Sequence, residues 1–295
     1  MNPCRLMLAA GLLALLPMQA QAQARTWALV VGIDDYIHLD GVEGGDLLGA
    51  ENDVAGFVDY LTRGLSVPEE QILVLTGRDA TAAAVRRGLK SWLGERATAG
   101  DRVYFFYSGH GSQVLDQNGD EEDGLDETLA PADALPRSPE NDLVDDEIDA
   151  MLTSLDAAEI IVILDSCSSG TATKVVGREG RPRRLLRPLA RPKGLGTDSR
   201  GSGFVDRGRG RIVELAASAP NQTALDAAFL DDDGNVSFYG GAFTTHLLEQ
   251  LWAAVDSSSL QSVLDGAREA MREDHFEQEP QFSGSRSAPV KIRRP

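Results

Sequence analysis

Two residues of this sequence pair a nucleophile with an acid–base group. Cys167 lies in the segment 165–170 and His110 in the segment 107–111, each directly after an apolar run. A thiol that titrates near about pH 8.5 is only partly ionised at neutral pH, so it needs an imidazole to take its proton. The thiolate would attack a peptide carbonyl, and His110 would return the proton to the leaving amine. We expect the backbone N–H groups of Gly111 and Cys167 to stabilise the oxyanion.

Other interpretations of these residues stay open at this point. Cys167 and His110 could be a packed thiol and a turn imidazole with no chemistry. A hydrolase could instead use Ser166 or Ser168, although neither serine lies in a Gly-x-Ser-x-Gly segment. A catalytically silent binding module could present the same cleft to a partner. Retention of both the thiol and the imidazole favours the enzyme.

The rest of the chain predicts a sheet that brings the two residues together. Short runs that are apolar throughout predict buried strands, and amphipathic stretches between them predict helices. The predicted strands are 27–33, 72–75, 103–107, 160–164, 212–217 and a last short one at 281–283, and the predicted helices are 50–63, 81–97 (introduced by Thr81), 145–155, 241–255 and 259–275. We therefore expect one α/β domain with a mostly parallel sheet of about six strands sandwiched between helices. Neighbouring parallel strands present their carboxyl ends at one edge, so His110 and Cys167 should face each other there.

The first 24 residues have the pattern of a secretory signal peptide. Arg5 precedes an apolar run, 6–16, that is too short to span a bilayer, and small residues alternate with glutamine up to Ala24. Cleavage after Ala22 or Ala24 would leave Cys167 as the single cysteine of a periplasmic or secreted protein. Because an exported protein with structural cysteines normally pairs them, the lone thiol favours a chemical role. A disordered or buried N-terminal helix is the alternative.

Composition limits the partners. The 295-residue chain has a net charge of −18, which disfavours nucleic acid and anionic membranes as partners. We see no membrane-spanning segment after the signal and no motif for an organic cofactor. The segment 171–211 stands apart, because it holds 12 of the 28 Lys and Arg residues among Gly and Pro, and we interpret it as a mobile linker or long loop.

The segments around the two residues resemble the caspase-like peptidases, and specifically the metacaspases and their bacterial relatives in peptidase family C14. The resemblance covers residues 27–281, and its strongest anchors are Tyr107–Gly111 and Asp165–Gly170. The supporting segments, in chain order, are Gly49–Asp53, Asp120–Glu127, Gly241–Thr244 and Pro280–Ser283. This resemblance implies a caspase-haemoglobinase fold, a Cys/His dyad and endopeptidase cleavage after Arg or Lys. One departure is Ala50, where many metacaspases have cysteine.

By the same resemblance, Asp53, Ser108 and Asp165 line the specificity pocket. Carboxylates in such a pocket would pair with a guanidinium or ammonium group of the substrate. Selection for aspartate would need arginine in their place. For Asp53, a helix N-cap is the alternative interpretation.

The acidic segment 116–127 is a candidate cation site. It does not fit the EF-hand pattern, because Glu121 takes the position that needs glycine. Many metacaspases depend on calcium, and the family's acidic site maps loosely onto Asp126, Asp145 and Asp146, with Asp123 as a further candidate. The resemblance thus implies Ca²⁺ as a cofactor, and a solvated acidic loop is the alternative.

The specificity implied for this pocket suggests a role for the basic segment 171–211. An enzyme that selects Arg or Lys would find many cleavable bonds within 171–211, where caspase-like proteins are processed. We therefore expect a zymogen, self-processed into a large part (25–170) and a small part (212–295) of one domain spanning 25–295. We further expect a monomer that acts on protein or peptide substrates.

Overall fold

The architecture is that of a central sheet covered on both faces by helices. The computed structural model describes residues 24–42, 44–119, 121, 124–167, 180–183, 185, 211–219, 222–255, 257–284 and 290. The predicted signal peptide, residues 1–24, falls almost wholly outside the described residues. No helix in the described ranges is long and apolar enough to cross a membrane.

The central sheet has six strands in the order β12-β9-β7-β3-β1-β2. These are β1 (Thr26–Gly32), β2 (Ile72–Thr76), β3 (Arg102–Ser108), β7 (Glu159–Asp165), β9 (Ile212–Ala216) and β12 (Gln281–Gly284). All neighbours run parallel except β12, which pairs antiparallel with β9. The predicted mostly parallel α/β sheet is confirmed.

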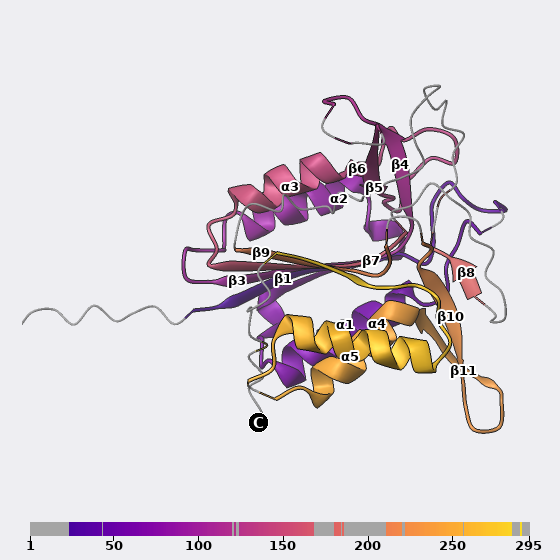
Figure 1. Cartoon of the computed structure of the whole chain (residues 1–295). Helices are drawn as coiled ribbons and strands as arrows, with labels where there is room; N and C mark the ends of the chain where they lie inside the picture. The colour runs from indigo at the N-terminus through magenta and orange to yellow at the C-terminus, as the bar shows by residue number, and fades with distance from the viewer. Residues whose placement is uncertain are drawn as a thin grey trace, which may run out of the picture.

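Helices lie in two layers (Figure 1). Helices α2 (Ala82–Arg87) and α3 (Asp145–Ser154) cover one face, and α1 (Ala50–Asp59), α4 (Ala242–Ala253) and α5 (Leu260–Glu273) cover the other. Wider helical turns extend α1 through Tyr60–Gly64 and α2 through Gly88–Leu93, and single 3₁₀ turns lie at Glu69–Gln71 and Gly77–Asp79. Thr81 caps α2 as expected, since its side chain accepts a hydrogen bond from Ala84 N.

The strands are apolar throughout because both of their faces are buried. On β1, Leu29 and Val31 belong to the core under α2 and α3. Ala28 and Val30, which alternate with them, belong to the core under α1, α4 and α5. Each face therefore has its own hydrophobic core, and the sheet between them is fixed from both sides.

Two small sheets that the sequence did not predict lie beyond one end of the central sheet (Figure 1). One contains β4 (Gly111–Leu115), β5 (Leu125–Leu129) and β6 (Leu143–Val144). The other contains β8 (Gly180–Pro182), β10 (Leu225–Leu230) and β11 (Val236–Gly241) in the order β11-β10-β8. Strand β8 lies inside the segment that we interpreted as a linker or loop, so part of that segment is paired chain.

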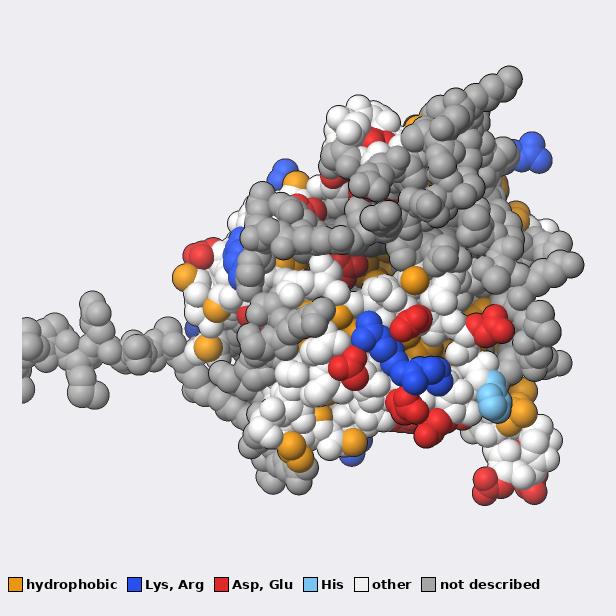
Figure 2. All heavy atoms as spheres, in the orientation of Figure 1, with side chains coloured by type: hydrophobic (Ala, Val, Ile, Leu, Met, Phe, Trp, Pro, Cys, Tyr) orange, Lys and Arg blue, Asp and Glu red, His pale blue; other side chains and the backbone are white. Residues whose placement is uncertain are grey.

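The face of the molecule that α5 presents carries interspersed charges of both signs (Figure 2). Arg268 pairs with Asp265 and Arg272 with Glu269 along this helix, each three residues apart. Such exposed pairs contribute little to stability. The candidate catalytic residues lie elsewhere, after the carboxyl ends of β3 and β7.

Candidate active site

The two chemical residues follow neighbouring strands. Strands β3 and β7 pair in register, with Ser108 opposite Asp165, and His110 and Cys167 each come two residues later. Gly111 N and Cys167 N donate hydrogen bonds to the same carbonyl oxygen. The sheet therefore brings His110 and Cys167 to one edge, as the sequence predicted.

The imidazole of His110 is fully buried and held by groups that the sequence did not reveal. Its Nε2 lies 3.0 Å from the carbonyl oxygen of Gly45, and its backbone N donates to Tyr36 Oη at 2.7 Å. The Tyr36 ring lies against the imidazole, with ring centroids 4.9 Å apart. A Nε2–H donated to Gly45 leaves Nδ1 as the nitrogen that can accept a proton, and Nδ1 has no hydrogen-bond partner among the described residues.

Burial lowers the pKa of His110 to about 4. The backbone carbonyl of Gly45 opposes this effect, and the positive charge of Arg183 adds to it. The imidazole is thus neutral at ordinary pH. A neutral imidazole is the form that can act as a general base.

The thiol of Cys167 is buried, with 1% of the residue exposed, and it is in no disulfide. Ala224 N donates a hydrogen bond to Sγ at 3.0 Å, and the carbonyl oxygen of Ala224 lies 3.3 Å from Sγ. An N–H donor aimed at the sulfur favours the thiolate. Ala224 carries no side-chain chemistry, so sequence reasoning had no signal for this contact.

The predicted pocket residues meet around a guanidinium. Arg183 lies there with a fully buried side chain, and its Nη2 contacts Asp53 Oδ2 at 2.7 Å and Asp226 Oδ1 at 3.1 Å. Its Nη1 donates to Ser108 Oγ and lies 3.6 Å from Asp165 Oδ1. The structure therefore brings the three predicted pocket residues together and adds Asp226. Asp226 lay in a run of small apolar residues with no motif to mark it.

The segment Gly241–Thr244 orients the pocket carboxylates. Gly241 N donates to Asp53 Oδ1 at 2.9 Å, and Thr244 donates to Asp165 Oδ2 from its N and Oγ1 at 2.9 and 2.7 Å. A side chain at position 241 would not fit, since its Cβ would lie 2.0 Å from Asp165 Oδ2. The N-cap interpretation of Asp53 is wrong, because Gly49 is the N-cap of α1 and Asp53 lies inside the helix.

The charges of this pocket depend on one another. Burial raises the pKa of Asp53, the charge of Asp165 raises it further, and Arg183 opposes both. Burial alone would lower the pKa of Arg183, but Asp165, Asp53 and Asp226 raise it well above its usual value. The guanidinium is therefore the counter-ion on which the buried carboxylates depend.

Only some of the acidic residues predicted to bind metal lie close together. Asp145 begins α3, and its carboxylate lies within 4.8 Å of those of Glu121 and Glu127. Asp126 is buried on β5, whereas Asp146 is exposed and accepts a hydrogen bond from Asn118 Nδ2 at 2.6 Å. Asp123 lies outside the described residues. Glu121 and Glu127, which lie with Asp145 in this cluster, were not among the predicted ligands, although both belong to the acidic segment that the sequence singled out.

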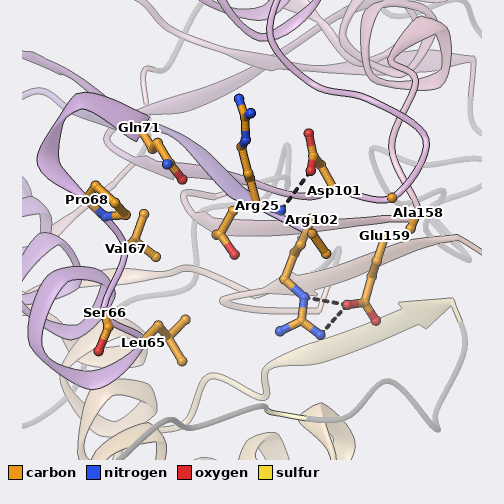
Figure 3. A pocket seen from close by; sticks show the side chains of 13 residues that line it. Arg25, Leu65, Ser66, Val67, Pro68, Gln71, Asp101, Arg102, Ala158 and Glu159 are labelled. Atoms are coloured by element: carbon orange, nitrogen blue, oxygen red, sulfur yellow. Dashed lines mark hydrogen bonds and ion pairs between the residues drawn. The ribbon is translucent and has the colours of Figure 1, made fainter. Parts of the chain in front are cut away.

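A separate pocket of about 580 Å³ lies at the other end of the strands (Figure 3). Arg102 and Glu159, at the starts of β3 and β7, form an ion pair in it, and Arg25 N donates to Asp101 Oδ1 at 2.8 Å. The catalytic candidates follow the carboxyl ends of these strands. This pocket is therefore not the one that serves the thiol.

A buried thiol and imidazole at adjacent ends of a parallel sheet, beside a carboxylate-lined pocket, define the site of a caspase-type cysteine peptidase. The model of the caspase domain family (Peptidase C14) matches residues 25–290, and the chain belongs to this family.

Relatives in sequence agree with this assignment. Metacaspase-1 of Saccharomyces cerevisiae is 29% identical over 92% of this chain and 69% of its own length. Metacaspase-3 of Arabidopsis thaliana is 36% identical over 42% of this chain and 36% of its own length. These relatives support a caspase-like cysteine peptidase, and they favour it over the binding-module alternative.

Solved structures show the same fold. A crystal structure of a protein from Geobacter sulfurreducens superposes with a TM-score of 0.61 and 23% identity, covering 91% of this chain and 99% of that one. Caspase-1 from Spodoptera frugiperda superposes with a TM-score of 0.52 and 11% identity, covering 90% of this chain and 88% of that one. The predicted caspase-type fold is confirmed.

Proposed function

We propose that this chain is an endopeptidase that cleaves after Arg or Lys, with Cys167 as the nucleophile and His110 as the acid–base group. The observation that carries the proposal is the position of Arg183. Its guanidinium fills the pocket, while its carbonyl oxygen accepts hydrogen bonds from Gly111 N at 3.1 Å and Cys167 N at 3.2 Å. The residue whose cation fills the pocket thus also presents its carbonyl oxygen to the backbone N–H groups of Gly111 and Cys167.

The pocket chemistry supports specificity for a basic side chain. Asp53, Asp165 and Asp226 are all at most 3% exposed, so their charges act with little solvent screening. An aspartate side chain in their midst would add a fourth buried carboxyl group and no cation. Charge-assisted hydrogen bonds to a guanidinium, by contrast, satisfy several of these oxygens at once.

The proposed reaction follows from the contacts of the two residues. Nδ1 of His110 takes the proton of the Cys167 thiol, whose sulfur already accepts a hydrogen bond from Ala224 N. The thiolate attacks the carbonyl carbon, and the N–H groups of Gly111 and Cys167 hold the oxygen as it becomes an oxyanion. His110 then protonates the leaving amine, and water hydrolyses the thioester to release the acid.

A calcium site near the acidic cluster is a second element of the proposal. The carboxylates of Glu121, Glu127 and Asp145 offer the hard oxygen ligands that Ca²⁺ prefers, and two of these residues are buried. Burial raises the pKa of Asp145 to about 8, and the charges of Asp126, Asp146 and Glu121 add to it, so a divalent cation would relieve the repulsion. The residues present fit the ion. Bound calcium would link Glu121 of the acidic segment to Glu127 on β5 and Asp145 on α3.

We also propose that the basic segment 171–211 is where the chain processes itself, and that the precursor is exported as a monomer by its signal peptide. The support for self-processing is that residues 180–182 of this segment pair with β10 and that the carbonyl oxygen of Arg183 accepts hydrogen bonds from Gly111 N and Cys167 N. The support for export is the N-terminal pattern of the sequence alone. The substrates of such an enzyme are proteins or peptides with Arg or Lys before the cleaved bond.

Peptide hydrolysis tests the activity. Mature protein (residues 25–295) would be assayed under reducing conditions on fluorogenic peptides ending in Arg, Lys or Asp, with calcium and with chelator. We expect turnover of the Arg and Lys peptides only, and none in Cys167→Ala or His110→Ala. The matched control is Ser166→Ala, which should retain activity because the thiol performs the attack. Activity that is lost in S166A but kept in C167A would replace the thiol mechanism with a serine one, and no turnover in any of them would favour the binding module.

A further inference from the structure

The thiol and the N–H group that contacts it belong to two different sheets. Cys167 follows β7 of the central sheet, whereas Ala224 precedes β10, which pairs with β11 and β8. Among the described residues no strand pairing joins β10 to the central sheet. The 3.0 Å contact between Ala224 N and Cys167 Sγ therefore needs another group to hold the two sheets at the right distance.

The side chain of Gln278 joins the two sheets. Its Nε2 donates a hydrogen bond to Ala217 O at 3.0 Å, directly after β9, and its Oε1 accepts one from Leu225 N at 3.0 Å, at the start of β10. The amide must lie this way round, because the reverse would set donor against donor and acceptor against acceptor. Gln278 is 5% exposed, so water competes little for either bond.

These two bonds belong to a closed set of contacts around the sulfur. Ala217 N donates to Leu164 O at 2.9 Å, and Leu164 lies on β7, the strand that leads to Cys167. On the other side, the amide oxygen of Gln278 holds the residue next to Ala224, whose N donates to the sulfur. Gln278 therefore links the strand that carries the thiol to the residue that contacts it.

The backbone on either side of Gln278 is held by a second glutamine. Gln222 Nε2 donates to Glu277 O at 3.0 Å, and its Oε1 accepts from Glu279 N at 2.7 Å. Beyond these residues, β12 pairs antiparallel with β9. The amide of Gln278 is therefore presented to the two sheets from a fixed backbone.

We propose that Gln278 is a positioning residue of the peptidase, whose amide holds the N–H group of Ala224 against the sulfur of Cys167. This inference rests on the proposed thiol chemistry and adds a residue that acts through Ala224 rather than on the substrate. A donor aimed at the sulfur stabilises the thiolate over the thiol. Ala224 O also accepts a hydrogen bond from Arg183 N at 3.0 Å, so the same residue aligns the chain that lies in the cleft.

Two substitutions at this position separate positioning from packing. Gln278→Met keeps the length of the side chain but removes both hydrogen bonds. Gln278→Glu keeps the acceptor for Leu225 N, and it can donate to Ala217 O only while its carboxyl group is protonated. The matched control is Gln281→Met, because the amide of Gln281 donates to Glu279 O, within its own segment, at 2.7 Å.

The first measurement is the ionisation of the thiol. Mature protein (residues 25–295) contains Cys167 as its single cysteine, so the ultraviolet absorbance of the thiolate can be titrated against a Cys167→Ala blank. We expect wild type and Q281M to share one midpoint, and Q278M to have a midpoint about one pH unit higher, because the sulfur loses its N–H donor. Q278E should match Q278M, since its carboxyl group is ionised in this range.

The second measurement is kcat for a fluorogenic Arg peptide as a function of pH. In Q278M, kcat should fall at least about 10-fold, since a small displacement of a reacting group slows the attack. In Q278E, the ratio of kcat to that of wild type should approach 1 near about pH 5 and fall as the pH rises, because the carboxyl group loses the proton that it donates to Ala217 O. A defect of packing alone would not give this rescue at low pH.

The outcomes also separate this inference from the peptidase itself. Circular dichroism and thermal unfolding establish that each variant is folded, and if Q278M is unfolded, Q278E decides. Equal midpoints in the folded variant and wild type, or a Q278E ratio that does not depend on pH, would overturn the inference and leave the peptidase intact. A raised midpoint in Q278M together with no peptide turnover by wild type would support the positioning of the thiol and overturn the peptidase.

Discussion

Two clusters of mostly buried carboxylates in this molecule differ in what compensates their charge. In the pocket, Asp53, Asp165 and Asp226 surround the guanidinium of Arg183, which opposes the rise in the pKa of Asp53. In the acidic cluster, burial raises the pKa of Asp145, and the neighbouring carboxylates raise it further. The first cluster carries its cation as part of the chain, and the second is suited to one from solution. On the proposed function, the same residue type would recognise a side chain in one cluster and an ion in the other.

The largest expected effect comes from breaking the pocket. Asp53→Asn removes the carboxylate that contacts the guanidinium most closely, at 2.7 Å, and loss of one partner of a buried ion pair costs about 3–5 kcal/mol. We expect kcat/KM for Arg peptides to fall by at least about 100-fold and self-cleavage to slow in parallel. The control is Asp59→Asn on the same helix, whose partner Arg63 is exposed. Equal activity in D53N and D59N would show that Asp53 does not bind substrate.

The charge of the occupied pocket reaches His110, which gives a pH dependence. Burial, with the charge of Arg183, lowers the pKa of His110 from 6.5 to about 4 in the folded state. Between these values the unfolded chain binds the proton and the folded chain does not, so stability falls as pH falls from about 6.5 to 4. The total loss is about 3 kcal/mol. Urea unfolding against pH should show a shallower slope for His110→Gln, while exposed His38→Gln should match wild type.

The acidic cluster gives an intermediate effect. Asp145→Asn removes one charge from the group formed with Glu121 and Glu127, and calcium affinity depends on the number of charged ligands. We expect calorimetry to show calcium binding at least about 10-fold weaker, with a matching shift in the calcium dependence of hydrolysis. Asp149→Asn on the same helix is the control. A calcium response that is unaltered in D145N would place the ion elsewhere.

The smallest effect concerns the choice between Arg and Lys. Arg183 Nη2 contacts Asp53 and Asp226 while its Nη1 lies 3.6 Å from Asp165 Oδ1, and a single ammonium nitrogen lacks the planar fork that makes these contacts at once. Asp226→Asn should therefore reduce the preference for Arg over Lys peptides by about 5-fold, which corresponds to about 1 kcal/mol. The readout is the ratio of the two kcat/KM values. Exposed Asp232→Asn should leave the ratio unchanged, and an unchanged ratio in D226N would remove Asp226 from the recognition of the side chain.

Most of the central sheet could be predicted, because strands that are buried on both faces have sequences that are apolar throughout. The runs at 103–107 and 160–164 gave β3 and β7 within a residue or two, and these two strands position His110 and Cys167. The small sheets were missed for the opposite reason. Strand β8, Gly180–Pro182, is exposed and has no apolar pattern, and its pairing with β10 depends on chain that is distant in sequence.

The site could be predicted where a motif marks a residue and not where geometry alone selects it. His110, Cys167 and Asp165 stand in recognisable segments. Arg183 is chemically equal to its basic neighbours in the sequence, and only the fold places it in the pocket. Gly45 and Ala224 act through backbone atoms, which every residue possesses, so no side-chain signal could have identified them.

Strand order has a consequence for what a cut between β7 and β9 would leave behind. The two strands lie side by side within the central sheet, paired over five residues from Ile160–Ile212 to Leu164–Ala216, and both contribute to the same hydrophobic core. The two parts of the protein are therefore held together by this pairing and by the shared core, and their association does not depend on the chain that joins them. Two polypeptides made separately, ending near residue 183 and beginning near residue 211, should assemble into one split enzyme. They would elute together from a sizing column and separate only in denaturant.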